Sequence, residues 1–206
     1  MRYKIISFDL QATLSLGKFS DEFWIERLPL LYSKFYGKSV EDSKRELKQL
    51  FGEYGKYDYR YYSQQYWFDR LQVMESFDKI VDLMRNKPIF FEDTKKIIEE
   101  LFGKVPMIII STTTREFIDV EMGENKKYFL KTYSTIDDLE IAGKPKIAFE
   151  KVCLELGVLP SEILHIGDNQ EMDIANGKMA GVDTFYFDNK LSREKNVARL
   201  REMLGL

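Results

Sequence analysis

The sequence predicts an α/β protein, in which helices cover both faces of a parallel sheet and a second, all-helical domain is inserted near the amino end. Short apolar segments alternate with helical patterns of about ten residues or more from residue 86 onward, and parallel strands need crossover connections of that length. One further apolar segment, residues 3–9, is separated from the others by a long run of helical patterns. We therefore predict a core domain of residues 1–14 and 86–206 and an inserted helical domain of residues 15–85.

The inserted domain is predicted to be helical from about Ser20 through a last pattern at 78–84. Ser20 and Ser39 are placed as N-caps, because a serine hydroxyl can accept a hydrogen bond from the first helical turn. Gly37 is placed to end a helix. Pro29 is predicted to kink or split the first helix, since proline has no backbone N–H to donate.

The core is predicted to alternate strands and helices after residue 92. The strands are 106–111, a weak one near Tyr133, 163–167 and 184–187, and the helices are 92–102, one from about Thr114, one opened by Pro145, 170–180 and 192–204. Glycines follow three of these helices, at positions 103, 157 and 181, where a left-handed residue can end a helix. The order predicts a parallel sheet with both faces covered.

Composition excludes several classes of function. With 31 basic and 34 acidic residues and a net charge of −3, we expect no broad basic face for nucleic acid or for an anionic membrane. No apolar run approaches the roughly 20 residues of a membrane span, and the amino end shows no signal-peptide pattern. We expect a cytoplasmic protein with a small-molecule partner. Cys153 is the only cysteine, which excludes an internal disulfide and a cysteine-based metal cluster and favours a small core residue.

Four polar clusters fall where predicted strands end or helices begin. Ligands of open parallel sheets bind beyond the carboxyl ends of the strands, so these clusters are candidates for one site. Singly, each has an ordinary interpretation as a turn, an N-cap or a solvated charge. The residues are Asp9 with Thr13, Ser111 with Thr112, Lys144, and Gly167 and Asp168 with Asp173.

Taken in order, these clusters resemble the haloacid dehalogenase superfamily. The matching pattern is Asp9-x-x-x-Thr13, an apolar strand ending at Ser111, Lys144-Pro145, and the segment Gly167–Asp173. The resemblance covers nearly the whole chain and implies a Rossmann-like core with a helical cap inserted after the first motif. It also implies a hydrolase, most often a magnesium-dependent phosphatase that acts on a small phosphorylated metabolite through an aspartyl-phosphate.

The resemblance gives each residue an expected role, which elementary chemistry supports. Oxygen ligands suit Mg²⁺, and a carboxylate that attacks phosphorus needs its own charge and that of the phosphate screened. We expect Asp9 to be the nucleophile, and Asp9, Asp168 and the Gln11 backbone carbonyl to bind Mg²⁺, with Asp173 orienting the site or binding through water. Phosphoryl oxygens are expected to contact Ser111, Thr112 and Lys144, while Thr13 fixes the loop or touches the phosphate.

Gln11 departs from the pattern of phosphatases in this superfamily. They carry an aspartate there, which protonates the leaving group and then activates water. Glutamine cannot transfer a proton at neutral pH, and such acid–base help is worth about 10²–10⁴ in rate. Glu22 or another carboxylate of the inserted domain is a candidate replacement.

Three alternatives therefore stay open. A metal-independent 2-haloacid dehalogenase would attack carbon with Asp9, but would not need Gly167 and Asp168. A phosphate-binding protein with little turnover would follow if Gln11 disables the site. A phosphonatase would need a Schiff-base lysine, for which the inserted segment offers Lys34, Lys38, Lys44, Lys48 and Lys56. Substrate identity and oligomeric state do not follow from the sequence.

Two other features favour structural roles. His165 lies in a predicted core strand, where we expect a buried, neutral side chain. The segment 57–68 is rich in aromatic residues: Tyr57, Tyr59, Tyr61, Tyr62, Tyr66, Trp67 and Phe68. It is expected to form the core of the inserted domain or a subunit interface, with one or two rings at the entrance of a pocket.

Overall fold

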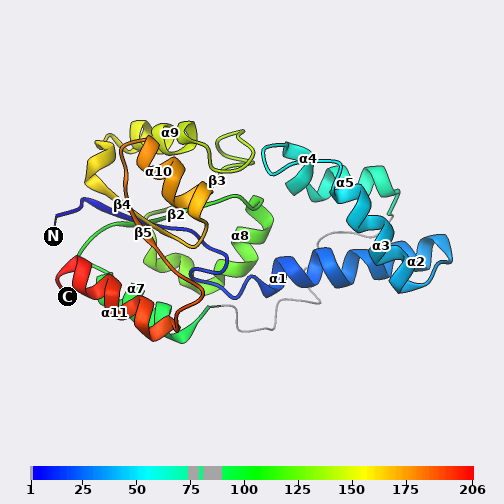
Figure 1. The fold of residues 1–206 in the computed structure, drawn as a ribbon, viewed down its shortest axis with the longest axis horizontal. Helices are drawn as coiled ribbons and strands as arrows, with labels where there is room; N and C mark the ends of the chain where they lie inside the picture. Colours follow the sequence, from blue (N-terminus) through cyan, green and yellow to red (C-terminus); the bar gives the residue numbers. More distant parts are fainter. Residues whose placement is uncertain (1, 74–78, 81–89) are drawn as a thin grey trace.

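The structure of the protein is a computed structural model that describes residues 2–73, 79–80 and 90–206 (Figure 1). Within these ranges the core is a five-stranded, fully parallel sheet of order β3-β2-β1-β4-β5. The strands are β1 (Ile5–Phe8), β2 (Met107–Ser111), β3 (Lys131–Ser134), β4 (Ile163–Gly167) and β5 (Asp183–Tyr186). The predicted α/β fold class is confirmed. No helix within the described ranges is long and apolar enough to cross a membrane.

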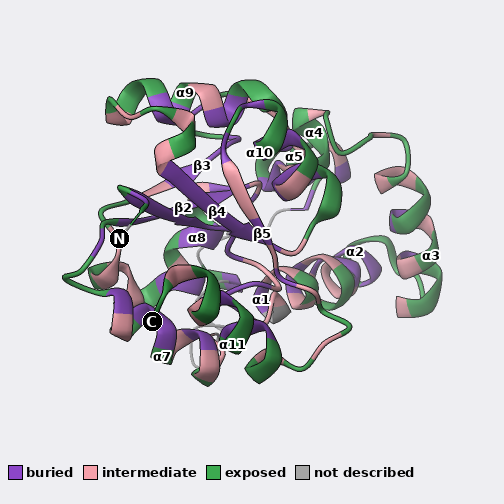
Figure 2. Cartoon of the chain, turned by 60° about the vertical axis from the view of Figure 1, so that its left-hand side comes forward, coloured by how far each residue is buried: buried purple, intermediate pink, exposed green. Residues whose placement is uncertain are grey.

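Alternate side chains of the buried strands point to opposite faces of the sheet, which divides the core into two layers. In β2, Met107 and Ile109 join the cluster that packs against α7 (Glu92–Leu101), α8 (Arg115–Met122) and α11 (Arg193–Leu204). Ile108 and Ile110 join the opposite cluster, beneath α9 (Lys146–Leu156). Figure 2 shows the strands buried between these two helical layers, whose outer sides are exposed. Cys153 lies in the second cluster, as expected.

Helix boundaries in the core follow the predicted signals, with two differences. Ser192 caps α11 through a bond from Lys195 N, and Gly157 ends α9 in the left-handed region, with φ of 65°. Pro145 is the residue before α9 rather than the first residue of its first turn. The single helix expected at 170–180 is a π-helical turn, η4 (Gln170–Ala175), followed by α10 (Asn176–Met179). Two 3₁₀ turns lie at Gly123–Tyr128 and Pro160–Glu162 among the described residues.

The segment after β1 is helical, as predicted. It contains α1 (Lys18–Asp21), the π-helical turn η1 (Glu22–Arg27), α2 (Leu28–Tyr36), α3 (Val40–Phe51), α4 (Tyr59–Tyr62) and α5 (Gln64–Leu71); we call these the inserted helices. Ser39 caps α3 and Gly37 ends α2, as expected. Pro29 lies in the first turn of α2, where the helix type changes. The N-cap expected at Ser20 is wrong, because Ser20 lies inside α1.

A third hydrophobic cluster holds the inserted helices together and joins them to the core. Its largest buried ring is Trp67, and Phe23 and Leu28 are fully buried beside it. Phe117 of α8 belongs to the same cluster, with its ring centroid 5.2 Å from that of Phe23. The inserted helices therefore pack on one helix of the core. The domain boundary expected at 85–86 and most of the helix expected at 78–84 lie outside the described residues.

Candidate active site

Residues predicted for the site come together at the carboxyl ends of the central strands. Asp9 follows β1 and Asp168 follows β4, two strands that pair side by side. Asp173 reaches the same point from η4. One carboxylate oxygen from each of these three aspartates lies within 4.8 Å of the others. The parallel sheet thus brings together carboxylates that are more than 150 residues apart in the chain.

Lys144 is the cation of this cluster. Its side chain is almost completely buried, with 2% exposed. The ammonium donates hydrogen bonds to Asp9 Oδ1 at 2.6 Å, to the Ile110 carbonyl at 3.1 Å, and to Asp173 Oδ1. Because an ammonium has three donors, a contact with a phosphoryl oxygen requires one of these bonds to be exchanged.

Asp173 is held on both oxygens by protein groups. Lys144 and His165 Nε2, at 3.1 Å, share Oδ1, and the backbone N–H of Asn169 donates to Oδ2 at 2.9 Å. His165 is fully buried, with Nδ1 2.8 Å from Ser7 Oγ. The expected burial of His165 is confirmed, and burial lowers its pKa, which favours the neutral form. Asp173 is therefore fitted to orient the site rather than to give up an oxygen to a direct ligand.

Electrostatics at the cluster are unbalanced, because three carboxyl groups share one ammonium. Burial raises the pKa of Asp9 to about 8; Lys144 opposes this, and Asp173 and Asp168 add to it. Burial and then Asp173 also raise the pKa of Asp168. Although burial disfavours its charged form, Asp173 keeps a pKa below its usual range through Lys144 and His165. A further positive charge would stabilise all three carboxylates.

The oxygen donors left at this point fit a magnesium ion. Asp168 Oδ2 accepts from Asn189 Nδ2 at 2.9 Å, and no side chain in the described part of the chain donates to its other oxygen. Asp9 likewise uses only Oδ1. The predicted third ligand, the Gln11 carbonyl, accepts no hydrogen bond from any described residue. Carboxylate and carbonyl oxygens without competing thiols are the donor set that Mg²⁺ prefers.

The Gln11 side chain is hydrogen-bonded to a carboxylate of α8. Its Nε2 donates to Glu121 Oε1 at 2.6 Å, and Ser15 Oγ donates to Glu121 Oε2 at 2.6 Å. Burial raises the pKa of Glu121 to about 7, against the effect of these two hydrogen bonds. The carboxylate beside Gln11 therefore belongs to α8 of the core, whereas Glu22, expected to be a candidate, pairs with Arg27 at 2.8 Å.

The loop that carries Gln11 is fixed from the far end of the chain. Arg193 donates to the carbonyls of Ala12, at 3.2 Å, and Thr13. Its guanidinium carbon lies 3.3 Å from the ring centroid of Phe91. Thr13 is fully buried, and its hydroxyl has no hydrogen-bond partner within the described ranges. Sequence reasoning missed Arg193 and Glu121, since neither belongs to a motif.

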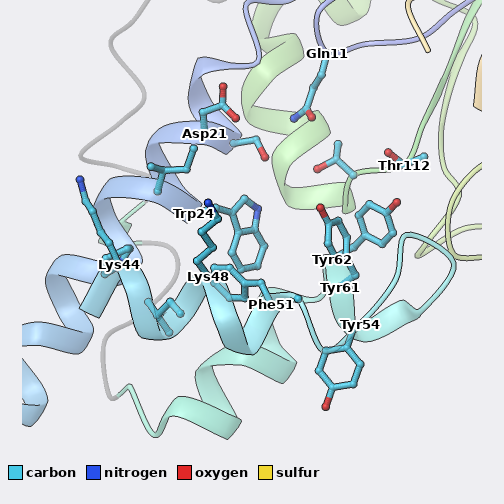
Figure 3. A pocket seen from close by; sticks show the side chains of 16 residues that line it. Gln11, Asp21, Trp24, Lys44, Lys48, Phe51, Tyr54, Tyr61, Tyr62 and Thr112 are labelled. Atoms are coloured by element: carbon cyan, nitrogen blue, oxygen red, sulfur yellow. The ribbon is translucent and has the colours of Figure 1, made fainter. Parts of the chain in front are cut away.

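On the other side, Ser111 and Thr112 take their predicted positions at the end of β2. Ser111 is buried, and its hydroxyl accepts weakly from Thr113 N at 3.4 Å. Thr112 is half-buried and lines a cavity of about 760 Å³ together with Gln11. Figure 3 shows this cavity, with Gln11 and Thr112 at one end and Trp24 and the tyrosines of the inserted helices beyond them.

Comparison with known families identifies the fold and the chemistry class. The family described as haloacid dehalogenase-like hydrolase matches residues 6–187. The chain belongs to this family. As a member of it, the protein is a hydrolase of the haloacid dehalogenase superfamily, and the predicted resemblance is confirmed. A search of curated proteins finds no match.

Solved structures with the same fold include both phosphatases and a dehalogenase. A haloacid dehalogenase-superfamily phosphatase from Thermococcus onnurineus is 18% identical, with 98% of each chain covered and a TM-score of 0.82. The putative hydrolase YfnB from Bacillus subtilis, solved with magnesium bound, is 16% identical over 100% of each chain, with a TM-score of 0.72. A 2-haloacid dehalogenase from Pseudomonas syringae is 19% identical over 98% of each chain, with a TM-score of 0.57. At these identities the likeness shows the shared fold alone.

Proposed function

We propose that this protein is a magnesium-dependent phosphatase that hydrolyses a small phosphorylated metabolite. The observation that carries the proposal is the meeting of Asp9, Asp168 and Asp173 around the buried Lys144. Three carboxylates with one ammonium favour a divalent cation, and a cation beside a carboxylate nucleophile favours an anionic substrate. The phosphatase and the magnesium-bound hydrolase among the structural neighbours support this choice.

In the proposed mechanism one carboxylate oxygen of Asp9 attacks phosphorus and the other would be a ligand of Mg²⁺. The bond between phosphorus and the leaving oxygen breaks, and an aspartyl-phosphate forms on Asp9. Asp9, Asp168 and the Gln11 carbonyl would hold Mg²⁺, which would neutralise charge on the phosphoryl group. Lys144 exchanges one of its hydrogen bonds for a phosphoryl oxygen, and Ser111 donates to another. Water then hydrolyses the aspartyl-phosphate and regenerates the carboxylate.

Gln11 orients the leaving group in this scheme but does not protonate it. Its Nε2 gives one of its two N–H donors to Glu121, so the amide can offer its second N–H and its carbonyl oxygen to a substrate or water. An amide oxygen accepts a hydrogen bond and carries no transferable proton. Turnover should therefore depend strongly on the leaving group, with activated aryl phosphates hydrolysed fastest.

Hydrolysis of p-nitrophenyl phosphate with Mg²⁺ tests the proposal. We expect activity that a chelator abolishes and that Asp9→Asn lowers by about 10³-fold or more, because the nucleophile is lost. Asp69→Asn is the matched control, since Asp69 is exposed on α5 and its carboxylate accepts only from Gln65 among the described residues. Activity that survives chelation, or that is equal in the Asp9 and Asp69 variants, contradicts the proposal.

Two other functions give different results in the same experiments. Halide release from 2-chloropropionate without metal would identify a dehalogenase that attacks carbon with Asp9. Thermal stabilisation by phosphate with no turnover of any ester would identify a phosphate-binding protein. The second alternative draws on Gln11 and on the three hydrogen bonds that already occupy Lys144.

A further inference from the structure

The cavity beside Gln11 is large, and five of its sixteen lining residues are aromatic. Its volume of about 760 Å³ lies in the upper part of the range for small-molecule sites, and a three-carbon metabolite would leave much of it empty. Trp24, Phe51, Tyr54, Tyr61 and Tyr62 line it. Figure 3 shows these rings gathered on the side away from Gln11. A leaving group attached to a phosphate at Asp9 would pass Gln11 and Thr112 to enter this space.

Two of the rings are suited to ligand binding: Trp24 is held rigidly by its neighbours, and Tyr61 is partly exposed. Trp24 makes edge-to-face contacts with Phe23, Phe51 and Phe117, at centroid distances of 4.9, 5.6 and 6.4 Å. These contacts fix the indole before a ligand arrives, which lowers the entropic cost of binding. Tyr61 is 44% exposed, so its ring has surface left for a ligand.

Charges around the cavity are arranged unequally. Lys44 is held by both oxygens of Glu26, at 2.9 and 2.8 Å. Lys48 makes no ion pair with any described residue, and Figure 3 shows its side chain extending beside Trp24. Asp21 carries negative charge at the Gln11 end, where it acts on Glu121. A second anionic group on a ligand would therefore be favoured beside Lys48.

We propose that this cavity binds the leaving group of the substrate, and that this group is an aromatic ring carrying a second anionic substituent. The inference rests on the proposed phosphatase function and narrows its substrate class. An aromatic leaving group gains ring-on-ring contacts with this lining that a saturated group such as a polyol does not gain. A flat ring instead packs on Trp24 and Tyr61, and its distal anion meets Lys48.

Phosphonates test the inference, because they bind without being hydrolysed and so separate recognition from leaving-group chemistry. Calorimetry with Mg²⁺ compares benzylphosphonate with its saturated match, cyclohexylmethylphosphonate. We expect the aromatic compound to bind about five-fold more tightly, as for aromatic contacts of about 1 kcal/mol. A para-carboxylate on the benzyl ring should add about three-fold, as for a partly exposed ion pair.

Variants assign these preferences to residues. Trp24→Leu should remove the preference for the aromatic compound, and Tyr61→Leu serves the same purpose if Trp24→Leu fails to fold. Tyr59→Leu is the control and should keep the preference, because the Tyr59 ring is exposed and lies outside the cavity. Lys48→Gln should remove the carboxylate effect, and Lys34→Gln should not. Equal binding of the ring and its saturated match, or a preference that survives both cavity variants, overturns the inference. If p-nitrophenyl phosphate is hydrolysed in that case, the proposed function stands; if no phosphonate binds and no ester is hydrolysed, both fail.

Discussion

At the scale of single residues, Glu121 is the least expected part of the site. It is 1% exposed, and its two oxygens accept from Gln11 and Ser15. A buried carboxylate costs free energy unless it is hydrogen-bonded or neutral. With a pKa of about 7, the group is close to balance between its two protonation states near neutral pH, which makes it sensitive to changes at position 11.

Glu121→Gln is predicted to flatten the pH dependence of stability. The pKa rises from 4.5 in the unfolded chain to about 7 in the folded one, so the folded state holds the extra proton between these values. The stabilisation is fully present below pH 4.5 and is lost as pH rises through 7, by about 3 kcal/mol at most. Urea unfolding at pH 5 and pH 8 measures this, and contributions common to both proteins, such as Asp9, cancel. An identical pH dependence in the variant would contradict the shift.

Gln11→Asp is predicted to raise turnover of p-nitrophenyl phosphate by about ten-fold or more, since it restores a proton-transferring group. The structure adds a condition, because the new carboxylate would lie near Glu121, and neighbouring carboxylates raise each other's pKa. We therefore expect a larger gain when Glu121→Gln is combined with Gln11→Asp than from Gln11→Asp alone. Steady-state rates of Gln11→Asp, of Glu121→Gln and of the double variant, all with saturating Mg²⁺, test this expectation. No rise in either Gln11→Asp protein would mean that Gln11 is not the missing proton shuttle.

At the scale of elements, the loop after β1 depends on α11. Ala12 has φ of 60°, in the left-handed region, and Arg193 binds its carbonyl and that of Thr13. The same guanidinium lies over Phe91 and Phe187. An arginine fork can serve two carbonyls at once, which a lysine ammonium on a thinner stem does less well. The α11 helix thereby positions the loop that carries Gln11.

Arg193→Lys is predicted to destabilise the fold by about 1–2 kcal/mol, the cost of weakening hydrogen bonds from a half-buried charged group. Turnover should fall as well, because the Gln11 carbonyl would no longer be held in place. Arg199→Lys is the matched control on the same helix, where the side chain donates only to Asn196 among the described residues. Chemical unfolding and p-nitrophenyl phosphate kinetics should separate the two variants. Equal effects would show that Arg193 is an ordinary surface arginine.

The elements themselves were largely predictable from the sequence, whereas these long-range contacts were not. Ile163–Gly167 and Met107–Ser111 are marked by local apolar runs, and Ser39 and Ser192 by local capping chemistry, so each signal lies within a few residues. The Gln11–Glu121 bond spans 110 positions and the Arg193–Thr13 bond 180. Neither follows from spacing or composition, because only the packed sheet brings these partners together. Site residues with a motif could be listed in advance, and those without one could not.

At the scale of the whole molecule, the inserted helices touch the core at a second place besides Phe117. The loop before α4 reaches across to η4, where Lys56 pairs with Glu171 and Tyr57 donates to the same carboxylate at 2.7 Å. The Tyr57 ring also packs against Gly143, beside Lys144, where a Cβ would meet it at 2.8 Å. This contact links the position of the inserted helices directly to the segment that carries Lys144.

Glu171→Gln is predicted to weaken this second contact with little effect on the stability of the fold. The groups are exposed, so the expected effect is small: a KM increase of about two- to five-fold, with kcat less affected. Because exposed ion pairs are screened by salt, KM of the wild type should rise with ionic strength, while KM of the variant should rise less. Glu116→Gln, on the exposed side of α8, is the control. An unchanged KM would show that the contact does not help substrate binding.

Magnesium is predicted to stabilise the whole molecule, because the three carboxyl groups at the site have only the Lys144 ammonium to balance their charge. A ligand present at about 100 times its Kd adds about 2.7 kcal/mol to the free energy of unfolding. Asp168→Asn should abolish this increment and, with chelator present, should unfold at a higher temperature than the wild type, since one of three crowded carboxylates is gone. Asp69→Asn should keep the wild-type behaviour in both conditions. Thermal unfolding with chelator and with saturating Mg²⁺ gives all the comparisons, and a full magnesium increment in Asp168→Asn would place the ion elsewhere. Asp168→Asn is thus expected to raise the unfolding temperature relative to the wild type with chelator and to lower it with Mg²⁺. These opposite signs distinguish a metal site from a carboxylate cluster that only supports the fold, because loss of a supporting carboxylate would lower the unfolding temperature in both conditions.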